Sequence, residues 1–297
     1  MPTISVVIAS KVGSPFIDQC LDSLKNEVTS LGAEAIVVTP RPEEYARRIE
    51  ARFPWVRVVR DPDAAGVPAL RRRGVDEASG DYVAIIEEHC SAAPDWLRQA
   101  MAAFAKGRYA AVGGAITDYG YDRLRDWLVY FIEYNASLPP VSAGETHELN
   151  DANIAYPRQL LLEHRHLLDD GYWPMSLHPT LAARGEKFLS VPEMVVYHRG
   201  PFDFFYYLHQ RFLFSRAFAG VRARKQSPVR RLAYLVAAPI VPLMLVARMT
   251  RTVVAKGRRV PEFVKTLPLI VPAVTVLVVG EWIGCLLGPG NALSEVE

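Results

Sequence analysis

The feature that most constrains the fold is an alternation of strand-like and helix-like segments over the first 90 residues. The β-branched run TISVVIA at 3–9 precedes a helical pattern at 15–30, and the alternation continues to the strand-like DYVAII at 81–86. Strands that alternate with helices at this spacing predict an α/β fold with a mostly parallel, twisted sheet and flanking helices. Ligands of such sheets bind at the carboxyl ends of the strands, which here include 9–13 and 87–90.

Residues 110–200 show a less regular pattern. The sequence predicts one strand at AAVGGAI, a helix at 121–134, an exposed loop at SLPPVSAGETHEL, and a strand in FLSVPEMVVYH that ends at His198. We interpret Gly113 and Gly114 as a close approach of two backbone segments, because the phosphate-binding patterns GxGxxG and GxxxxGK[ST] do not occur in the sequence.

The charge composition changes near residue 200. Residues 1–200, which we predict to form one domain, carry 21 Lys/Arg and 27 Asp/Glu, whereas residues 201–297 carry 13 and 5. This second region contains an aromatic-rich helical pattern at 202–218, which is typical of a helix at a membrane–water interface. Two apolar stretches follow, at 232–247 and 267–280.

Both apolar stretches are shorter than the roughly 20 residues that a spanning helix needs, and each contains two prolines. The segments 221–231 and 248–265, before and between them, together carry eleven Lys/Arg and one Glu. Because both basic segments favour the cytosolic side, we expect a re-entrant or interfacial hairpin rather than two full spans. Buried helices of a soluble domain are the alternative.

Cysteine usage and the N-terminus bear on the compartment. Cys20, Cys90 and Cys285 have no CxxC spacing, which argues against a disulfide framework and against a zinc site built from cysteines. The N-terminal MPTISVVIAS has no basic segment, and its apolar run is shorter than that of a signal peptide. We therefore expect a reducing compartment, and the net charge of +2 does not indicate a nucleic-acid partner.

Acidic and imidazole groups directly follow the strand at 81–86. Glu87, Glu88 and His89 offer oxygens and a ring nitrogen that can hold a divalent ion, and such an ion can neutralise a diphosphate. Three arginines at 71–73 lie just upstream on a predicted helix, where guanidinium groups can pair with phosphate oxygens. A solvated loop is the alternative interpretation of the triplet when it is taken alone.

The order of segments over about residues 3–220 resembles the family 2 glycosyltransferases, whose nucleotide-sugar-binding fold is called GT-A. ISVVIASKVGSPFIDQCLDSL is similar to the first strand, loop and helix of that family. In VRVVRDPDAAGVPALRRRGVDEASGDYVAIIEEHC, the triplet Glu87-Glu88-His89 takes the place of the metal-binding Asp-x-Asp motif. NDANIAYPRQLL resembles the acceptor-side segment, VPEMVVYHRGPFDFFYYLHQRFLFSRAFAG the end of the catalytic domain, and GEWIGCLLGPG the tail of membrane-attached members.

The resemblance implies roles for individual residues. The expected cofactor is Mn²⁺ or Mg²⁺, and the implied ligands are Glu87, His89 and His198. A UDP- or GDP-linked sugar is expected to contact residues at the strand ends and on the basic helix, namely Ala9, Ser10, Lys11, Thr39, Arg71, Arg73, Glu87 and Glu88. The acceptor is expected to contact Asn153, Arg211 and Arg216. For His198, Asn153 and the two acceptor arginines, a purely structural or interfacial role is the alternative.

Three departures from the family pattern affect the predicted mechanism. IVVTPRPEE replaces the acidic pair after the second strand, and Glu-Glu-His carries less negative charge than Asp-x-Asp. The base motif of the family falls near Trp173-Pro174, so Asp169, Asp170 and His178 are the nearest candidates for a catalytic base. A phosphate acceptor needs no base, whereas a hydroxyl acceptor needs one, for which Asp170 is our first choice.

We therefore expect an enzyme that transfers a sugar, with inversion, from a nucleotide-diphosphate donor to a lipid-linked acceptor, as in polysaccharide or glycolipid biosynthesis. The acceptor is either a polyprenyl phosphate or a lipid-linked saccharide, and the expected location is the cytosolic face of the inner membrane. Homo-oligomerisation is left open. The alternatives are a non-catalytic scaffold that binds nucleotide sugar and, with less support, a nucleotidyltransferase.

Overall fold

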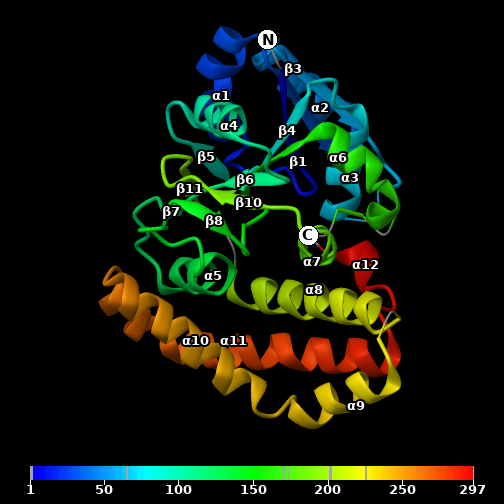
Figure 1. The fold of residues 1–297 in the computed structure, drawn as a ribbon, viewed down its shortest axis with the longest axis vertical. Coiled ribbons are helices and arrows are strands. Elements are labelled where there is room, and N and C mark those ends of the chain that lie inside the picture. The colour runs from blue at the N-terminus through cyan, green and yellow to red at the C-terminus, as the bar shows by residue number, and fades with distance from the viewer. Residues whose placement is uncertain are drawn as a thin grey trace. The chain divides into compact units, whose positions relative to one another are not determined.

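The chain forms two compact units, shown in Figure 1. The computed structural model describes residues 3–64, 66–169, 171–172, 174–200, 203–224 and 226–296. The first unit comprises Met1–Tyr119 and Ser137–Arg199, and the second comprises Gly120–Ala136 and Gly200–Glu297. The second unit therefore includes a segment from the middle of the chain as well as the region after residue 200.

The first unit is built on an eight-stranded sheet with the strand order β3-β2-β1-β4-β9-β6-β10-β8. Its strands are β1 (Ile4–Ala9), β2 (Glu34–Thr39), β3 (Val56–Arg60), β4 (Tyr82–Ile86), β6 (Ala111–Gly113), β8 (Gly144–Thr146), β9 (Asn153–Pro157) and β10 (Phe188–Ser190). β3, β2, β1 and β4 are parallel, as the alternation predicts. Because β9 is antiparallel to β4, the amino end of β9 lies beside the carboxyl end of β4.

Helices cover both faces of this sheet. They are α1 (Ile17–Leu31), α2 (Glu43–Arg52), α3 (Val67–Glu77), α4 (Trp96–Lys106), α6 (Arg158–Glu163), the 3-10 helix η1 (Arg165–Leu168) and α7 (Pro174–Ala183). α3 contacts α6, α1 contacts α4, and Figure 1 shows these two pairs on opposite sides of the sheet. α1 buries Ile17, Leu21 and Leu24 at helical spacing and ends at Gly32, whose φ of 60° suits a glycine.

A separate three-stranded sheet with the order β5-β11-β7 completes the first unit. Its strands are β5 (Cys90–Ala92), β7 (Ile116–Asp118) and β11 (Val196–His198). Two stretches for which one strand each is predicted are divided between the two sheets, so that prediction is wrong, although a strand does end at His198 as predicted. AAVGGAI supplies both β6 and β7, and FLSVPEMVVYH supplies both β10 and β11. The stretch expected to be a loop also contains β8, which pairs with β10.

The division at Gly113 and Gly114 has a steric cause. A Cβ at Gly113 would lie 2.6 Å from the carbonyl oxygen of Asn153, and one at Gly114 would lie 2.1 Å from that of Met194. Backbone oxygens cannot move aside as a flexible side chain does, so only glycine fits here. The interpretation of these glycines as a close backbone approach is confirmed.

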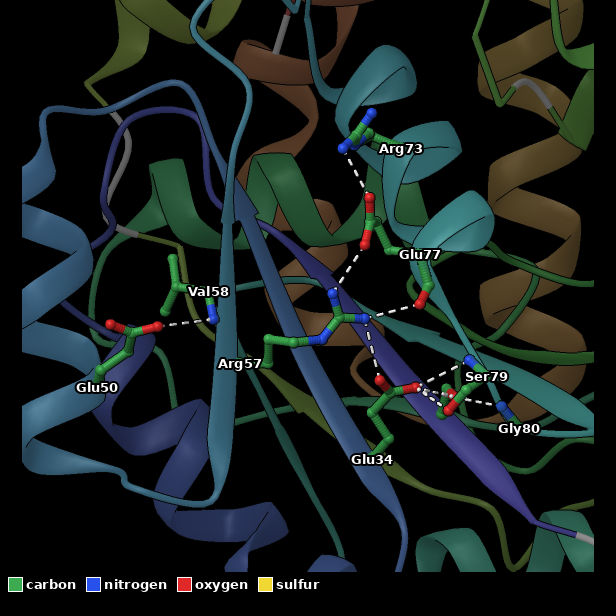
Figure 2. Close-up of polar contacts among 9 residues, drawn as sticks. Glu34, Glu50, Arg57, Val58, Arg73, Glu77, Ser79 and Gly80 are labelled. Atoms are coloured by element: carbon green, nitrogen blue, oxygen red, sulfur yellow. Dashed lines mark hydrogen bonds and ion pairs between the residues drawn. The ribbon is translucent and has the colours of Figure 1, made fainter.

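An ion-pair network joins β2, β3 and the end of α3 near the amino ends of the strands, whereas the predicted site lies at their carboxyl ends (Figure 2). Arg57 on β3 donates to Glu34 on β2 at 3.0 Å and to Glu77 at the end of α3 at 2.8 Å. Glu34 also accepts from the backbone of Ser79 at 3.0 Å, and Glu77 pairs with Arg73 at 2.6 Å. Arg73, one of the predicted donor-binding residues, is therefore part of this network.

The second unit is entirely helical in the part that the structure describes. Its helices are α5 (Leu124–Tyr134), α8 (Phe204–Arg224), α9 (Pro228–Ala237), α10 (Val241–Lys256), α11 (Val260–Leu287) and α12 (Ala292–Glu295). α8 and α11 lie side by side in Figure 1, and two glycines of α11 allow them to approach closely. A Cβ at Gly280 would lie 2.6 Å from the carbonyl oxygen of Phe212, and one at Gly284 would lie 2.3 Å from that of Arg216.

The two apolar stretches have different structures. The first, at 232–247, is broken between α9 and α10, and the helical segments Arg231–Ala237 and Val241–Lys256 meet at 75°. The second, at 267–280, lies within the 28-residue α11, which is longer than the stretch itself. By length and composition, α11 could cross a membrane, and the bent pair could form a second, broken span.

Candidate active site

The groups predicted to hold a metal ion lie on the turn between β4 and β5. Glu87 Oε2 and His89 Nε2 are 3.1 Å apart, and one ligand atom each from Glu87, His89 and Cys90 lies within 4.8 Å of the others. Glu87 and His89 are partly exposed, and Cys90 is buried. Carboxylate, imidazole and thiol are all metal ligands, so this donor set fits a divalent ion.

His198, the third predicted ligand, lies beside this group. It ends β11, and the strand register pairs it with Cys90 on β5. Its ring contacts that of His89 edge to face, with the centroids 5.0 Å apart. Burial and the neighbouring His89 lower the pKa of His198 well below its usual range, so the ring is neutral at neutral pH. His198 is not one of the three residues whose ligand atoms converge within 4.8 Å.

Arg71 is a buried cation between two carboxylates. Its side chain, 6% exposed, donates from Nη2 to Glu87 Oε1 at 3.0 Å and from Nη1 to Asp151 Oδ2. Burial alone would lower the pKa of Arg71, but the charges of Asp151 and Glu87 outweigh it and raise the pKa. Asp151 reaches this position because it precedes β9, whose amino end lies at the carboxyl end of β4.

The loop after β1, which is predicted to contact the donor, is fixed by Glu88. The buried Glu88 carboxylate accepts from Ser10 Oγ at 2.6 Å and from the backbone N–H of Ser14 at 2.9 Å. Ser10 Oγ also lies 2.8 Å from Tyr45 Oη. Burial raises the pKa of Glu88, against the lowering effect of these hydrogen bonds. In this geometry Glu88 orders the loop.

The other predicted donor contacts lie at the same edge of the sheet. Ala9 is the buried last residue of β1, and Lys11 is partly exposed in the following bend. Thr39, at the end of β2, donates from its hydroxyl to the carbonyl oxygen of Ser10 at 2.6 Å. Two β-strands and their loops are thus joined by side-chain hydrogen bonds at the point where a donor is expected.

Asn153, a predicted acceptor contact, is fully buried. Its side-chain oxygen accepts from the indole N–H of Trp96 at 2.8 Å, and its nitrogen donates to the carbonyl oxygens of Ala115 at 2.9 Å and Met194 at 2.7 Å. These bonds tie β9 to the segments that carry β7 and β11. The amide of Asn153 therefore serves the fold here, and its contact with an acceptor stays a prediction.

The three candidates for a catalytic base differ in their surroundings. Asp170 lies outside the described residues. The side chain of Asp169 is 70% exposed and lies 3.7 Å from Arg72 Nη2. His178 on α7 is buried, its Nε2 lies 2.6 Å from the hydroxyl of Tyr156, and Tyr172 donates to the same hydroxyl at 2.5 Å. Burial lowers the pKa of His178 to about 4.

The two predicted acceptor arginines belong to the second unit and are engaged there. Arg211 pairs with Glu133 of α5 at 2.6 Å and lies over the ring of Phe214. Arg216 donates from Nε to the carbonyl oxygen of Gly288 at 3.4 Å. Their contact with an acceptor stays a prediction.

Sequence reasoning missed four residues that the structure adds to this region. Asp151 and Tyr156 lie in the quoted segment NDANIAYPRQLL, but their contacts and those of Tyr172 span 16 to 80 residues of chain, so the segment did not reveal them. Cys90 directly follows the Glu-Glu-His triplet, and its adjacency to those groups was the available signal. Burial raises the pKa of the Cys90 thiol, which is therefore neutral when no ion is bound.

The fold of the chain is that of the GT-A glycosyltransferases. A mannosyltransferase from Pyrobaculum calidifontis, solved with GDP-Man and Mn²⁺, matches with a TM-score of 0.59 and 17% identity over 96% of this chain and 87% of that one. GalNAc-T7, solved with UDP, GalNAc and Mn²⁺, matches with a TM-score of 0.51 and 20% identity over 66% of this chain. The match spans 44% of the GalNAc-T7 chain.

The family follows from the sequence itself. The profile described as Glycosyl transferase family 2 matches residues 5–165, which is more than half of the chain. A search of curated proteins found no significant match. The chain belongs to glycosyl transferase family 2.

Proposed function

We propose that the chain transfers a sugar from a nucleotide-diphosphate donor, in the presence of a divalent ion. The observation that carries this proposal is the convergence of Glu87 and His89 at the carboxyl end of β4, beside the buried cation Arg71 and within the matched residues. The GDP-Man and Mn²⁺ in the structurally similar mannosyltransferase support a nucleotide sugar and an ion of this kind.

Different residues of the first unit have different roles in the proposed binding of the donor. Glu87 and His89 would hold the ion, which when bound neutralises charge on the leaving diphosphate. Lys11 is partly exposed at the strand ends where the donor is expected, whereas Ser10 and Thr39 are buried and would act by holding the loop after β1. Arg71 holds Glu87 in place through its hydrogen bond to Oε1, which leaves Oε2 directed at His89.

The acceptor is a lipid-linked group at the cytosolic face of the inner membrane. Large apolar side chains of α9, α10 and α11 are exposed, among them Val236, Leu243 and Val271. Eleven Lys/Arg in 221–231 and 248–265 accompany them in the sequence. Exposed apolar groups with neighbouring basic residues are the features that bind an anionic lipid surface.

The nature of the acceptor decides whether a base is needed. An acceptor oxygen attacks the anomeric carbon as the bond to the diphosphate breaks, with inversion. A phosphate acceptor is already ionised, whereas a hydroxyl must lose its proton to a base. His178 is buried against Tyr156, which makes it a poor base for an acceptor hydroxyl, and a polyprenyl phosphate would need no base.

Turnover by the full-length chain in detergent tests this function. A panel of nucleotide sugars is supplied with Mn²⁺ or Mg²⁺ and with either a polyprenyl phosphate or a lipid-linked saccharide, and nucleoside diphosphate and glycolipid are measured. We expect both products, and we expect His89→Ala to weaken donor binding and turnover together, whereas the exposed His166→Ala leaves them unchanged. No turnover with any donor would favour a scaffold, and release of pyrophosphate from nucleoside triphosphates would identify a nucleotidyltransferase.

Variants of the candidate bases distinguish the two acceptors. With a phosphate acceptor, Asp169→Asn, Asp170→Asn and His178→Gln should each leave the rate within about tenfold, an effect of about 1.4 kcal/mol on the barrier. A lost general base costs about 10²–10⁴-fold. A loss above about a hundredfold in one variant, with donor binding intact, would contradict the base-free mechanism.

A further inference from the structure

We infer that Cys90 is a third protein ligand of the ion held by Glu87 and His89, and that this site takes Zn²⁺ or Co²⁺ in preference to Mg²⁺. The inference rests on the proposed function only for the diphosphate oxygen that would fill the remaining coordination position. It concerns the chemical class of the ion, which the donor groups on this turn determine.

The geometry of the turn brings three different donors together. Glu87 Oε2 lies 3.1 Å from His89 Nε2, and the thiol of Cys90 lies with them inside 4.8 Å. Three protein ligands and one open position are the arrangement of catalytic zinc sites. A cluster of this composition differs from the all-oxygen shells that Mg²⁺ prefers.

Backbone contacts hold these donors in place. The backbone N–H of Cys90 donates to the carbonyl oxygen of Glu87 at 2.9 Å, which closes the turn. The thiol of Cys20 on α1 donates to the same oxygen at 3.6 Å. On β11, His198 is the register partner of Cys90, and its ring packs edge to face on His89. The turn is therefore fixed from α1 on one side and from β11 on the other.

Charge gives a second reason to include the thiol. Of Glu87, Glu88 and His89, only Glu87 offers a negative charge to the ion. His89 is neutral when it binds a metal. The Glu88 carboxylate instead accepts hydrogen bonds from Ser10 and Ser14. Coordination of Cys90 releases its proton to solvent and adds a thiolate. Because Asp151 offsets the charge of the neighbouring Arg71, the Glu87 carboxylate and the Cys90 thiolate together balance the two charges of the ion.

The chemical softness of these ligands then determines which ion the site favours. Thiolate and imidazole select borderline ions, and Mg²⁺ retains its water and oxygen ligands. The lack of CxxC spacing in the sequence argues only against zinc sites made of several cysteines. It does not apply to a mixed site in which one cysteine joins a carboxylate and an imidazole.

Cobalt binding by the full-length chain, without any donor, tests the inference. We expect one Co²⁺ per chain, with a thiolate-to-cobalt charge-transfer absorption that Zn²⁺ removes and excess Mg²⁺ does not. Cys90→Ser should abolish this absorption and weaken Co²⁺ binding by about tenfold or more. Cys20→Ser is the matched control, because Cys20 is equally buried and contacts the same turn but is outside the donor group, and it should retain the absorption.

A second measurement uses the unaltered chain, so that the inference can be tested even if the Cys90 variant does not fold. X-ray absorption of the zinc-loaded protein should show one sulfur at about 2.3 Å beside nitrogen and oxygen ligands at about 2.0–2.2 Å. A shell without sulfur, an absorption that persists in Cys90→Ser, or displacement of Co²⁺ by Mg²⁺ would overturn the inference. None of these results depends on sugar transfer, so the inference and the proposed function can fail separately.

Discussion

At the scale of single residues, Arg71 links the fold to the candidate site. Its guanidinium is buried between Glu87, which lies on the metal-binding turn, and Asp151, which precedes β9. Removal of one partner of a buried ion pair leaves an uncompensated charge, and this costs far more than the loss of an exposed pair. Arg71 therefore contributes to stability and to the position of Glu87 at once.

Substitution of Arg71 tests this double role. We expect Arg71→Gln to reduce the free energy of unfolding by about 3–5 kcal/mol, because Glu87 and Asp151 lose their cation. Arg165→Gln is the matched control, since Arg165 pairs with Asp76 at 2.9 Å but its side chain is 55% exposed, and its loss should cost less than about 1 kcal/mol. Urea unfolding measures the loss of stability in both variants. Equal losses would contradict the role of Arg71 as a buried ion-pair partner.

The stability of the first unit should depend on pH through His178. Burial lowers its pKa to about 4 in the folded chain, whereas the unfolded chain takes up a proton near the ordinary value of 6.5. The stabilisation is therefore complete above about pH 6.5 and is lost as the pH falls toward 4, by about 3 kcal/mol at most.

Unfolding curves at about pH 7 and about pH 4.5 check this dependence. His178→Gln should lose less stability between these two pH values than the unaltered chain, whereas the exposed His166→Gln should behave like the unaltered chain. If His178→Gln shows the same acid sensitivity as the unaltered chain, then His178 is not its source.

At the scale of elements, the close contact of α8 and α11 depends on Gly284. A Cβ there would lie 2.3 Å from the carbonyl oxygen of Arg216, so the two helices must separate to admit a methyl group. We expect Gly284→Ala to destabilise the second unit by about 1–3 kcal/mol. Val279→Ala, on an exposed part of the same helix, should stay within about 0.5 kcal/mol. Calorimetry in detergent compares the unfolding temperatures of the two variants. Equal unfolding temperatures would contradict the close packing of α8 and α11.

The elements also show how far the sequence alone could lead. The strand and helix alternation of residues 3–86 was predictable, because β1, β2 and β4 are buried runs whose apolar residues repeat locally. β6, β7, β10 and β11 have three residues each, and their ends are set by partners far away in the chain. β8 has the sequence GET, which carries no apolar pattern at all and is a strand only through its pairing with β10.

The residues of the candidate site were likewise predictable where a local motif carries them, and not where contacts between distant parts of the chain define them. Glu87 and His89 were found because a short motif at a strand end carries them, and their roles stay predictions. Asp151 was not found, since its partner Arg71 lies 80 residues earlier. Asn153 was noticed in a motif, but a motif does not reveal that all its amide groups are used inside the protein.

At the scale of the whole molecule, we expect the chain to require detergent. Val236, Leu243 and Met244 on α9 and α10 are 73%, 72% and 63% exposed. Each basic residue near an anionic surface adds roughly 1 kcal/mol, and inserted apolar side chains make release by salt alone difficult.

Flotation with vesicles that contain anionic lipid measures this attachment. The full-length chain should float with the vesicles at high salt, and serine at the three exposed apolar positions should reduce the floating fraction severalfold. Leu31→Ser, an exposed apolar position of α1 in the first unit, is the matched control and should leave flotation unchanged. A chain that is soluble and monodisperse without detergent would contradict the membrane proposal.

The inclusion of Gly120–Ala136 in the second unit also has a consequence for synthesis on the ribosome. α5 buries Trp127 and Phe131, and the ring of Phe131 packs on that of Phe263 with the centroids 5.1 Å apart. At about 5–20 residues per second, Phe263 emerges on the order of ten seconds after α5. During that interval α5 lacks its partner from α11, so a nascent chain that stops before residue 263 exposes the apolar face of α5 between the two segments of the first unit.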